Sequence, residues 1–409
     1  MVPLVPLVPH RSGAGRSTGQ AAAGLSVLPE LMRRAARIPS LAAKYAPHVG
    51  ADDLPELTAL PVLTQPELAR ATKEVLTLGR ASDSAQLWAD GGTLDSPALT
   101  LLPEGMFAPQ IRRVWRPLGP ADVLANLHPP GKLRPDHYFY NRFAAESGAT
   151  TLAFGRLPDG NHDDWLDFFA RHHVTAVAAP PETLRRLLGG TTAGRPVPWL
   201  RTLLLGGAAC DPTADAQIAE CFPYTDVWRL YGSPGAWVTG HRGPQCLADV
   251  YHPLPHQHVE IVDGMLRVTT LDVSRNPPLI RYQTQDRGEF ARCTCGLSGP
   301  AVRVFGPASP FFRFHGRAVS ARELVELATA GEEVTAAQVA VSGEQRIQLR
   351  VRLAPGVPDD HHTHAWIRFR VLESHLALAA CVTEQPDLFE VVAVDDVDPA
   401  AAVLVSEEY

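Results

Sequence analysis

The chain has 409 residues, a length that allows two or three domains. Apolar residues make up 45% of it and charged residues 20%, which excludes a mainly disordered protein. The formal net charge of -7 excludes a general binder of nucleic acid or anionic membranes, and no apolar run approaches the roughly 20 residues that cross a bilayer.

Residues 1–25 are expected to form a flexible leader. The apolar part of this segment contains prolines and no basic residue precedes it, which is the wrong pattern for a secretory signal. We therefore expect a cytoplasmic protein. Disulfides are rare in a reducing compartment, so clustering among the six cysteines indicates metal binding or catalysis.

Residues 26–305 are predicted to form a large domain of the α/β class. Apolar residues recur with helical spacing over 26–48, and Thr64 with Glu67 three positions later predicts the start of a further helix. Over 136–222, short apolar strands alternate with helical segments. This alternation indicates a parallel sheet that is covered by helices.

From Val227 the pattern changes to strands and turns, which predicts a strand-rich, mostly antiparallel subdomain. Residues 306–312 contain glycine and proline and are predicted to form a hinge. Residues 313–409 then predict a small α+β domain, with one continuous helix over 365–380 and a frayed end over 400–409.

Sulfur and nitrogen donors gather late in the large domain. Two cysteines separated by one residue follow a predicted strand, and a third cysteine and a histidine lie upstream. Thiolates with one imidazole match the Cys3His set of tetrahedral structural zinc, whereas soft thiolates argue against magnesium or calcium. His256 and His258 compete for the histidine position, and three unrelated buried cysteines are the alternative. The predicted zinc ligands are Cys246, His252, Cys293 and Cys295.

Five motifs occur in a family-like order: GGTLDSP, LLLGGAAC, YGSPG, PPLIRYQTQD and CTCG. Through them, residues 28–394 resemble the phenylacetate–CoA ligase branch of the adenylate-forming enzymes. The resemblance implies a large N-terminal α/β domain, a small mobile C-terminal α+β domain and a zinc set at the four positions above. It also implies activation of a carboxylic acid, often aromatic, as an acyl-adenylate, followed by transfer to coenzyme A.

The nucleotide-binding elements of that family are only partly present. The family's phosphate-binding loop aligns with Asp90–Pro97, inside a polar loop predicted over Trp88–Pro97, and its two aspartates would repel a polyphosphate. The Gly-Gly-Glu and Tyr-Gly-x-Thr-Glu elements have lost their magnesium-binding glutamates, at Ala208 and Gly235. The family's hinge motif has lost its arginine and aspartate at Gly306–Ser309.

Only a few of the family's nucleotide-binding residues are retained. No lysine occurs after Lys132, although the family's C-terminal lysine stabilises the adenylation transition state. Losing one well-placed electrostatic stabiliser costs about a hundred- to thousandfold in rate, so full chemistry with ATP and magnesium is not expected. The retained nucleotide or coenzyme A contacts are Gly92, Thr93, Gly206, Gly207, Tyr231 and Asp286.

An acyl group could still be handled without ATP. Cys210 follows a strand and precedes a helix, and a thiol at a helix N-terminus is more acidic than usual. We predict Cys210 as the nucleophile and His128 as its base, with His137 as the alternative base. The other interpretation is that Cys210 is a small buried hydrophobic residue.

The helix predicted over 136–148 carries aromatic residues that either line an acyl pocket or belong to the core, and the sequence leaves both interpretations open. They are Tyr138, Phe139, Tyr140 and Phe143.

The leading hypothesis is an acyltransferase that moves an acyl or aryl group between coenzyme A and the phosphopantetheine of a carrier protein, in specialised biosynthesis. A working aryl-acid–CoA ligase that forms an acyl-adenylate is the alternative. A third hypothesis is a non-catalytic scaffold that binds a carrier protein. None of these functions requires nucleic acid or a membrane as a partner.

Overall fold

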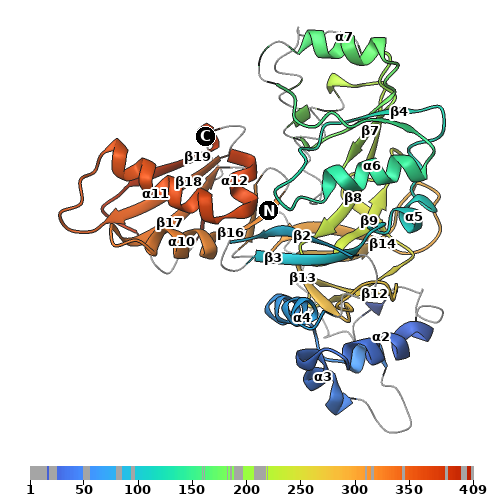
Figure 1. The fold of residues 1–409 in the computed structure, drawn as a ribbon, viewed down its shortest axis with the longest axis horizontal. Helices are drawn as coiled ribbons and strands as arrows, with labels where there is room; N and C mark the ends of the chain where they lie inside the picture. The colour runs from blue at the N-terminus through green and yellow to red at the C-terminus, as the bar shows by residue number, and fades with distance from the viewer. Residues whose placement is uncertain are drawn as a thin grey trace, which may run out of the picture.

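The computed structural model arranges the chain in two bodies with separate hydrophobic cores (Figure 1). The larger body contains a twelve-stranded mixed sheet, and the smaller body contains a four-stranded sheet. Within the described residues no helix has both the length and the apolar character needed to cross a bilayer. The described residues are 16–17, 25–48, 56–79, 85–93, 97–158, 160, 162–181, 183–184, 187, 197–206, 218, 220–308, 311–314, 317–342, 346–382, 386–397 and 403–406.

Three N-terminal helices share a core with the chain around Leu279–Tyr282. Helix α4 begins where the sequence predicts, because the Thr64 main-chain N–H and hydroxyl both donate to the Glu67 carboxylate at 2.8 Å. The burial of these helices joins segments that lie more than 200 positions apart in the sequence. The helices are α2 (Leu28–Ala35), α3 (Pro39–Tyr45) and α4 (Gln65–Thr77).

The parallel half of the large sheet contains the βα units that the sequence predicts. Its strand order is β8-β7-β6-β4-β5, and each neighbouring pair is parallel, so their carboxyl ends lie at one edge. Side chains alternate along β7, with Leu204 in the core of α5 and α6, and Leu203 and Leu205 in the core of α7. The elements are α5 (Ala108–Arg112), β4 (Val123–Asn126), α6 (Asp136–Glu146), β5 (Thr150–Leu152), α7 (Asp163–Arg171), β6 (Ala176–Ala178), β7 (Thr202–Leu205) and β8 (Asp226–Ser233).

The change to antiparallel pairing comes one strand later than the sequence predicts. Strand β8 still runs parallel to β7, with Leu203 opposite Val227, and the antiparallel pairs begin between β8 and β9. An apolar strand pattern does not encode the direction of its neighbour, which explains the difference. The strands are β9 (Trp237–Arg242), β10 (Val250–Pro253), β11 (Gln257–Val262), β12 (Met265–Thr270), β13 (Tyr282–Ala291) and β14 (Ala301–Pro307).

Part of the predicted leader belongs to this sheet. Residues Arg16–Ser17 form the short strand β1, which pairs antiparallel with β11 at its edge. The other residues of the segment 1–24 lie outside the described part of the chain.

The polar loop predicted over Trp88–Pro97 is largely a hairpin. Strands β2 (Ala85–Gly92) and β3 (Pro97–Pro103) pair antiparallel, with Trp88 opposite Thr100. The Trp88 side chain is 7% exposed and packs into the main core of the large body. This burial and the cross-strand pairing favour a strand where the composition suggests a loop.

The smaller body packs its helices against the sheet β19-β18-β17-β20 (Figure 1, orange to red). Helix α10 begins after Ser320, whose side chain accepts the main-chain N–H of Glu323. The hinge predicted at 306–312 overlaps the end of β14 at Pro307 and the start of β15 at Phe311, and residues 309–310 lie outside the described part of the chain. The elements are β15 (Phe311–Phe314), β16 (Arg317–Ser320), α10 (Ala321–Thr329), β17 (Val334–Ser342), β18 (Arg346–Leu353), α11 (His361–Ser374), α12 (Leu376–Val382), η4 (Pro386–Leu388), β19 (Phe389–Ala393) and β20 (Val403–Ser406).

Two expectations for this body are wrong. The helix predicted over 365–380 is broken at His375, whose Nδ1 accepts the main-chain N–H of Leu378 at 3.1 Å and so caps α12. The end predicted to be frayed contains β20, which pairs parallel with β17 and places Val403 opposite Val339. The strand β20 has no local signal, because it depends on pairing with the distant β17, and His375 combines its local cap of α12 with a bridge to the distant Thr93.

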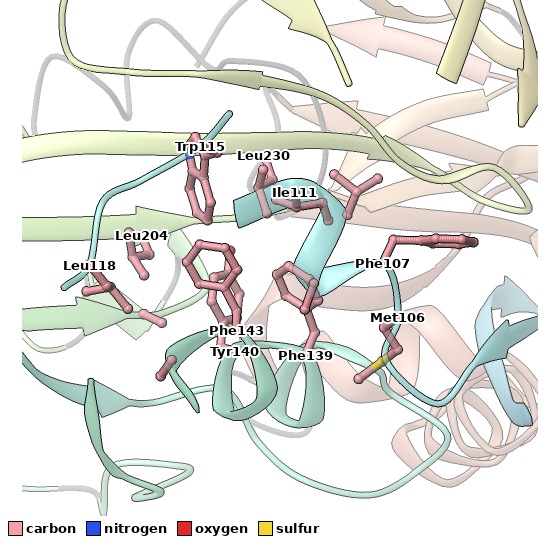
Figure 2. Close-up of a cluster of buried hydrophobic side chains, with 14 of the residues drawn as sticks. Met106, Phe107, Ile111, Trp115, Leu118, Phe139, Tyr140, Phe143, Leu204 and Leu230 are labelled. Carbon is pink, nitrogen blue, oxygen red and sulfur yellow. The ribbon is translucent and has the colours of Figure 1, made fainter. Parts of the chain in front are cut away.

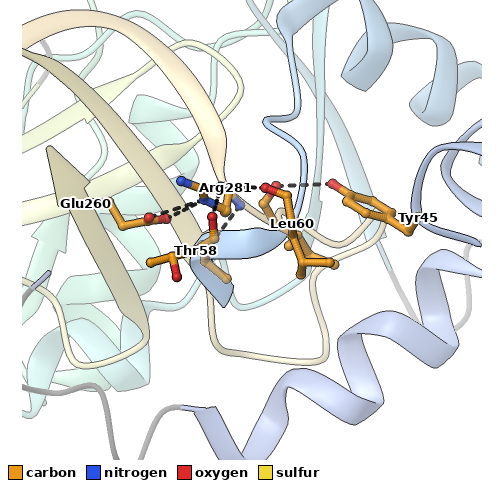
Figure 3. A network of polar contacts seen from close by, with 7 residues as sticks. Tyr45, Thr58, Leu60, Glu260 and Arg281 are labelled. Atoms are coloured by element: carbon orange, nitrogen blue, oxygen red, sulfur yellow. Dashed lines mark hydrogen bonds and ion pairs between the residues drawn. The ribbon is translucent and has the colours of Figure 1, made fainter. Parts of the chain in front are cut away.

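A buried ion pair joins the N-terminal helices to the antiparallel strands (Figure 3). The Arg281 guanidinium lies 3.1 Å from the Glu260 carboxylate, and the two side chains are 8% and 3% exposed. The same guanidinium donates to the carbonyl oxygens of Thr58 and Leu60. Tyr45 donates to the carbonyl oxygen of the residue that precedes Arg281. Removing either charge would leave the other buried without a counter-charge.

We therefore expect Glu260→Gln to lower the free energy of unfolding by about 3–5 kcal/mol, measured by urea denaturation. The matched control is Arg142→Gln, which breaks an exposed ion pair with Glu146 on α6. The control should change the same free energy by less than about 1 kcal/mol. Equal effects of the two substitutions would contradict the importance of the buried pair.

Candidate functional site

The carboxyl edge of the parallel strands holds two of the residues predicted to be functional. Strand β4 leads into His128, and β7 leads into Gly206. Ligands of open α/β sheets bind at this edge. The His128 imidazole is buried and stacks on the Tyr140 ring, with centroids 4.7 Å apart and an interplanar angle of 15°. The edge therefore contains a rigid pair of aromatic rings.

Asn126 fixes the loop that carries His128. Its amide N–H groups donate to the His137 carbonyl oxygen at 2.9 Å and to Asn141 Oδ1 at 2.7 Å, and its own Oδ1 accepts the His128 main-chain N–H. His137 Nδ1 lies 2.6 Å from the His128 carbonyl oxygen. Because a carbonyl oxygen can only accept, Nδ1 of His137 carries a proton and this ring is engaged in holding the loop.

The predicted nucleophile stays a prediction. Cys210 and Gly207 lie outside the described residues, so the described structure does not bring Cys210 together with His128.

The aromatic residues of α6 divide between the core and the surface. Phe139, Tyr140 and Phe143 are at most 1% exposed and project from α6 toward the strands that carry Leu204 and Leu230 (Figure 2). Their companion Tyr138, by contrast, is 42% exposed and rests on Trp88, with ring centroids 5.1 Å apart.

Two predicted nucleotide contacts are bonded to each other. The Tyr231 hydroxyl on β8 donates to Asp286 Oδ2 on β13 at 2.6 Å, and the two residues are 2% and 7% exposed. Gly92 ends β2, and Thr93 forms an isolated antiparallel bridge with His375 of the smaller body. The hairpin that aligns with the phosphate-binding loop thus contacts the smaller body directly.

The four predicted metal ligands converge. Their donor atoms all lie within 4.8 Å of one another, and Cys295 Sγ is 3.3 Å from His252 Nε2. A zinc tetrahedron with bonds of about 2.0–2.3 Å has edges of roughly 3.3–3.8 Å, so the set fits this metal. Strand β10 supplies His252, and the turn after β13 supplies the last two cysteines. The ligands are Cys246, His252, Cys293 and Cys295.

The surroundings of the cluster favour the thiolate form of Cys293. Burial opposes ionisation of Cys293, but the N–H groups of Cys295 and Leu247 and the His252 ring outweigh it and lower the pKa of Cys293 to about 6. Burial and the neighbouring cysteines raise the pKa of Cys246 to about 12. Metal binding would therefore have to displace a proton from Cys246.

The competing histidines are not part of the cluster. His256 stacks on Phe107 with ring centroids 4.8 Å apart, and neither of its ring nitrogens forms a hydrogen bond with a residue in the described ranges. Burial lowers the pKa of His256 to about 4, against the smaller opposite effect of Asp272. Burial also lowers the pKa of His258.

Sequence reasoning missed His241 beside the cluster. This residue lies opposite His252 in the β9–β10 ladder, with ring centroids 5.9 Å apart. Burial and the neighbouring His252 lower the pKa of His241 to about 4. Only the register of the two strands brings the rings together, so the sequence carries no signal for it.

Comparisons with known proteins agree with this architecture. Residues 138–270 match the family model described as AMP-binding enzyme. No curated protein is close enough in sequence to count as a match.

Several solved structures share the fold. The chain is similar to 2-hydroxyisobutyryl-CoA ligase in complex with 2-HIB-AMP and CoA in the thioesterification state, with a TM-score of 0.71, 16% identity, and coverage of 94% of this chain and 89% of that one. For the same ligase in the postadenylation state the TM-score is 0.58, with 15% identity and the same coverage. The amide bond synthetase McbA from Marinactinospora thermotolerans gives 0.56, at 17% identity over 92% of this chain and 81% of that one. The chain therefore has the fold of adenylate-forming ligases, including the smaller C-terminal body.

The four converging donor residues should hold a zinc ion. We expect about one zinc ion per purified chain, and we expect Cys293→Ser to lower both the zinc content and the melting temperature, because the metal ties two loops together. Cys221→Ser is the matched control, since Cys221 is an exposed cysteine outside the cluster. Zinc content is measured by atomic emission and melting by calorimetry. Full zinc content in Cys293→Ser would contradict the assignment.

The buried His256 should make the stability of the fold depend on pH. The folded pKa of His256 is about 4 and the unfolded value about 6.5, so the unfolded chain takes up this proton first as the pH falls. Stability is then lost progressively between about pH 6.5 and pH 4, by at most about 3 kcal/mol from this residue. His256→Phe should keep the stacking on Phe107 and make stability less dependent on pH in that range, measured by urea denaturation at several pH values. An unchanged slope would contradict it.

Proposed function

We propose that the chain is a diverged relative of the phenylacetate–CoA ligase branch that transfers an acyl or aryl group between coenzyme A and the phosphopantetheine of a carrier protein, without full ATP-dependent adenylation. The hydrogen bond between Tyr231 and Asp286 carries this proposal. The carboxylate proposed to bind a ribose is occupied by a hydroxyl of the chain itself.

Binding a nucleotide would require this contact to open. The two side chains are more than nine-tenths buried and their bond is short, so a ribose must replace a charge-assisted hydrogen bond that already exists. Magnesium binding has also lost its carboxylates, since Ala208 and Gly235 stand at those positions. Both features support a site that no longer binds the triphosphate of ATP.

The arrangement of the two bodies supports acyl transfer. The chain is more similar to 2-hydroxyisobutyryl-CoA ligase in its thioesterification state, with a TM-score of 0.71, than to the same ligase in its postadenylation state, at 0.58. The two states belong to one protein, so the difference reflects conformation. The structure of that ligase in the thioesterification state contains 2-HIB-AMP and CoA.

The metal cluster has a structural role in this proposal. Four ligands from two loops would close the coordination shell of zinc, leaving no position for a reactive water. Zinc there would stabilise the turn after β13, the strand that carries Asp286.

A working ligase is the second candidate. It is favoured by the match of residues 138–270 to the AMP-binding enzyme model and by similar structures that hold acyl-adenylates. The two candidates differ in whether they activate a free acid.

The experiment incubates the purified chain with benzoate or phenylacetate, ATP, magnesium and labelled pyrophosphate, and separately with phenylacetyl-CoA and pantetheine. We expect no ATP–pyrophosphate exchange above background and time-dependent formation of phenylacetyl-pantetheine. Mass spectrometry after exposure to phenylacetyl-CoA alone tests Cys210, because an acyl adduct lost in Cys210→Ala would identify it as the nucleophile.

The outcomes separate the candidates. Clear pyrophosphate exchange would support a working ligase as the function of the chain. Neither exchange nor transfer would leave a binding scaffold as the remaining function. Transfer that survives Cys210→Ala would indicate direct attack of the acceptor thiol on the thioester of phenylacetyl-CoA.

A further inference from the structure

The hydroxyl of Tyr140 is a buried polar group that forms no hydrogen bond with any residue that the structure describes. The residue is 1% exposed, and its Oη has no donor or acceptor partner among those residues. Buried phenol groups nearly always have one, because an unmet hydrogen bond destabilises the fold. A polar atom that is kept in this state is better explained by a ligand than by stability.

The hydroxyl points to the carboxyl edge of the parallel sheet. A Cβ atom built on Gly206 would lie 2.7 Å from Tyr140 Oη, so the hydroxyl lies directly against the main chain where β7 ends. Only glycine leaves room for it at this position. This is the edge at which open α/β sheets bind ligands.

The ring that carries the hydroxyl cannot easily turn away. It is stacked on His128 on one side and meets Phe139 edge-on, with ring centroids 5.2 Å apart. The His128 loop is itself held by the Asn126 side chain. Burial and the nearby Asp136 raise the pKa of the Tyr140 hydroxyl well above its usual value, so it stays a donor. The result is a preorganised O–H group in a water-excluded place.

We propose that the Tyr140 hydroxyl donates a hydrogen bond to the carbonyl oxygen of the acyl thioester that binds at the carboxyl ends of β4, β6 and β7. This inference rests on the proposed function and adds a catalytic residue to it. In this structure the hydroxyl is closed off from solvent, so the thioester reaches it when the main chain at Gly206 moves away while the stacked Tyr140 ring stays in place.

The chemistry needs no further reactant. The sulfur of the acceptor thiol attacks the carbonyl carbon, a C–S bond forms and the carbonyl electrons move to oxygen. The bond to the coenzyme A sulfur then breaks, and the proton of the acceptor thiol ends on the released coenzyme A. A donor at the oxygen binds the oxyanion more strongly than the starting carbonyl, which raises kcat more than it lowers KM.

The test compares two tyrosine-to-phenylalanine substitutions. Tyr140→Phe removes only the unbonded hydroxyl, so its melting temperature should be unchanged or higher. Its kcat for phenylacetyl transfer from phenylacetyl-CoA to pantetheine should fall by about ten- to a thousandfold, with KM changed by no more than a few-fold. Tyr45→Phe is the matched control, because that hydroxyl donates to the Ile280 carbonyl oxygen at 3.2 Å far from the edge. The control should lower the melting temperature and leave kcat unchanged.

A spectroscopic readout is independent of turnover. Phenylacetyl-CoA labelled with carbon-13 at the carbonyl should show a lower C=O stretching frequency when bound to the unaltered chain than when bound to Tyr140→Phe. Equal frequencies, or an unchanged kcat in Tyr140→Phe, would overturn the inference while leaving the proposed function intact. Failure of the unaltered chain to bind or transfer the thioester would overturn both.

Discussion

The buried contact between Arg281 and Glu260 connects most of the large body. Arg281 has a φ of 49°, a left-handed conformation that costs energy in a residue other than glycine, so its surroundings must hold it in place. Strand β13 begins at the next residue, carries Asp286 and leads into the turn of Cys293. The Arg281 side chain therefore links residues 58–60 and β11 to the start of the strand that carries Asp286. Because these groups come from segments far apart in the sequence, the contact forms only once the tertiary fold is complete.

Features that depend on a few neighbouring residues could be predicted from the sequence. The Thr64 start of α4 and the alternating βα units are of this kind. The convergence of Cys246, His252, Cys293 and Cys295 was also predictable, since the donor types and the Cys-x-Cys turn already indicate it. Features decided by distant partners could not be predicted. The burial of Trp88 in the main core and the pairing of β20 with β17 follow from packing that no local pattern contains.

The candidate site shows the same division. The carboxyl edge could be located from the order of strands and helices, and the structure places His128 there, two residues after the end of β4. The roles of the α6 aromatic residues could not be separated, because Tyr138 and Tyr140 differ only by a rotation of about 200° around the helix. That rotation exposes Tyr138 and buries Tyr140 against Gly206. A hydroxyl without a partner can be recognised only in three dimensions.

The last strand has a consequence for handling the molecule. Strand β20 covers one side of β17 through parallel pairs such as Val339 with Val403 and Ser342 with Ser406. A shortened polypeptide that stopped before Val403 would leave an open row of amide and carbonyl groups along β17. Such open edges recruit strands from other molecules and cause aggregation. Residues 403–406 thus replace the nine-residue β17 as the open edge of the small sheet by the four-residue β20, and a shorter edge is less prone to self-association.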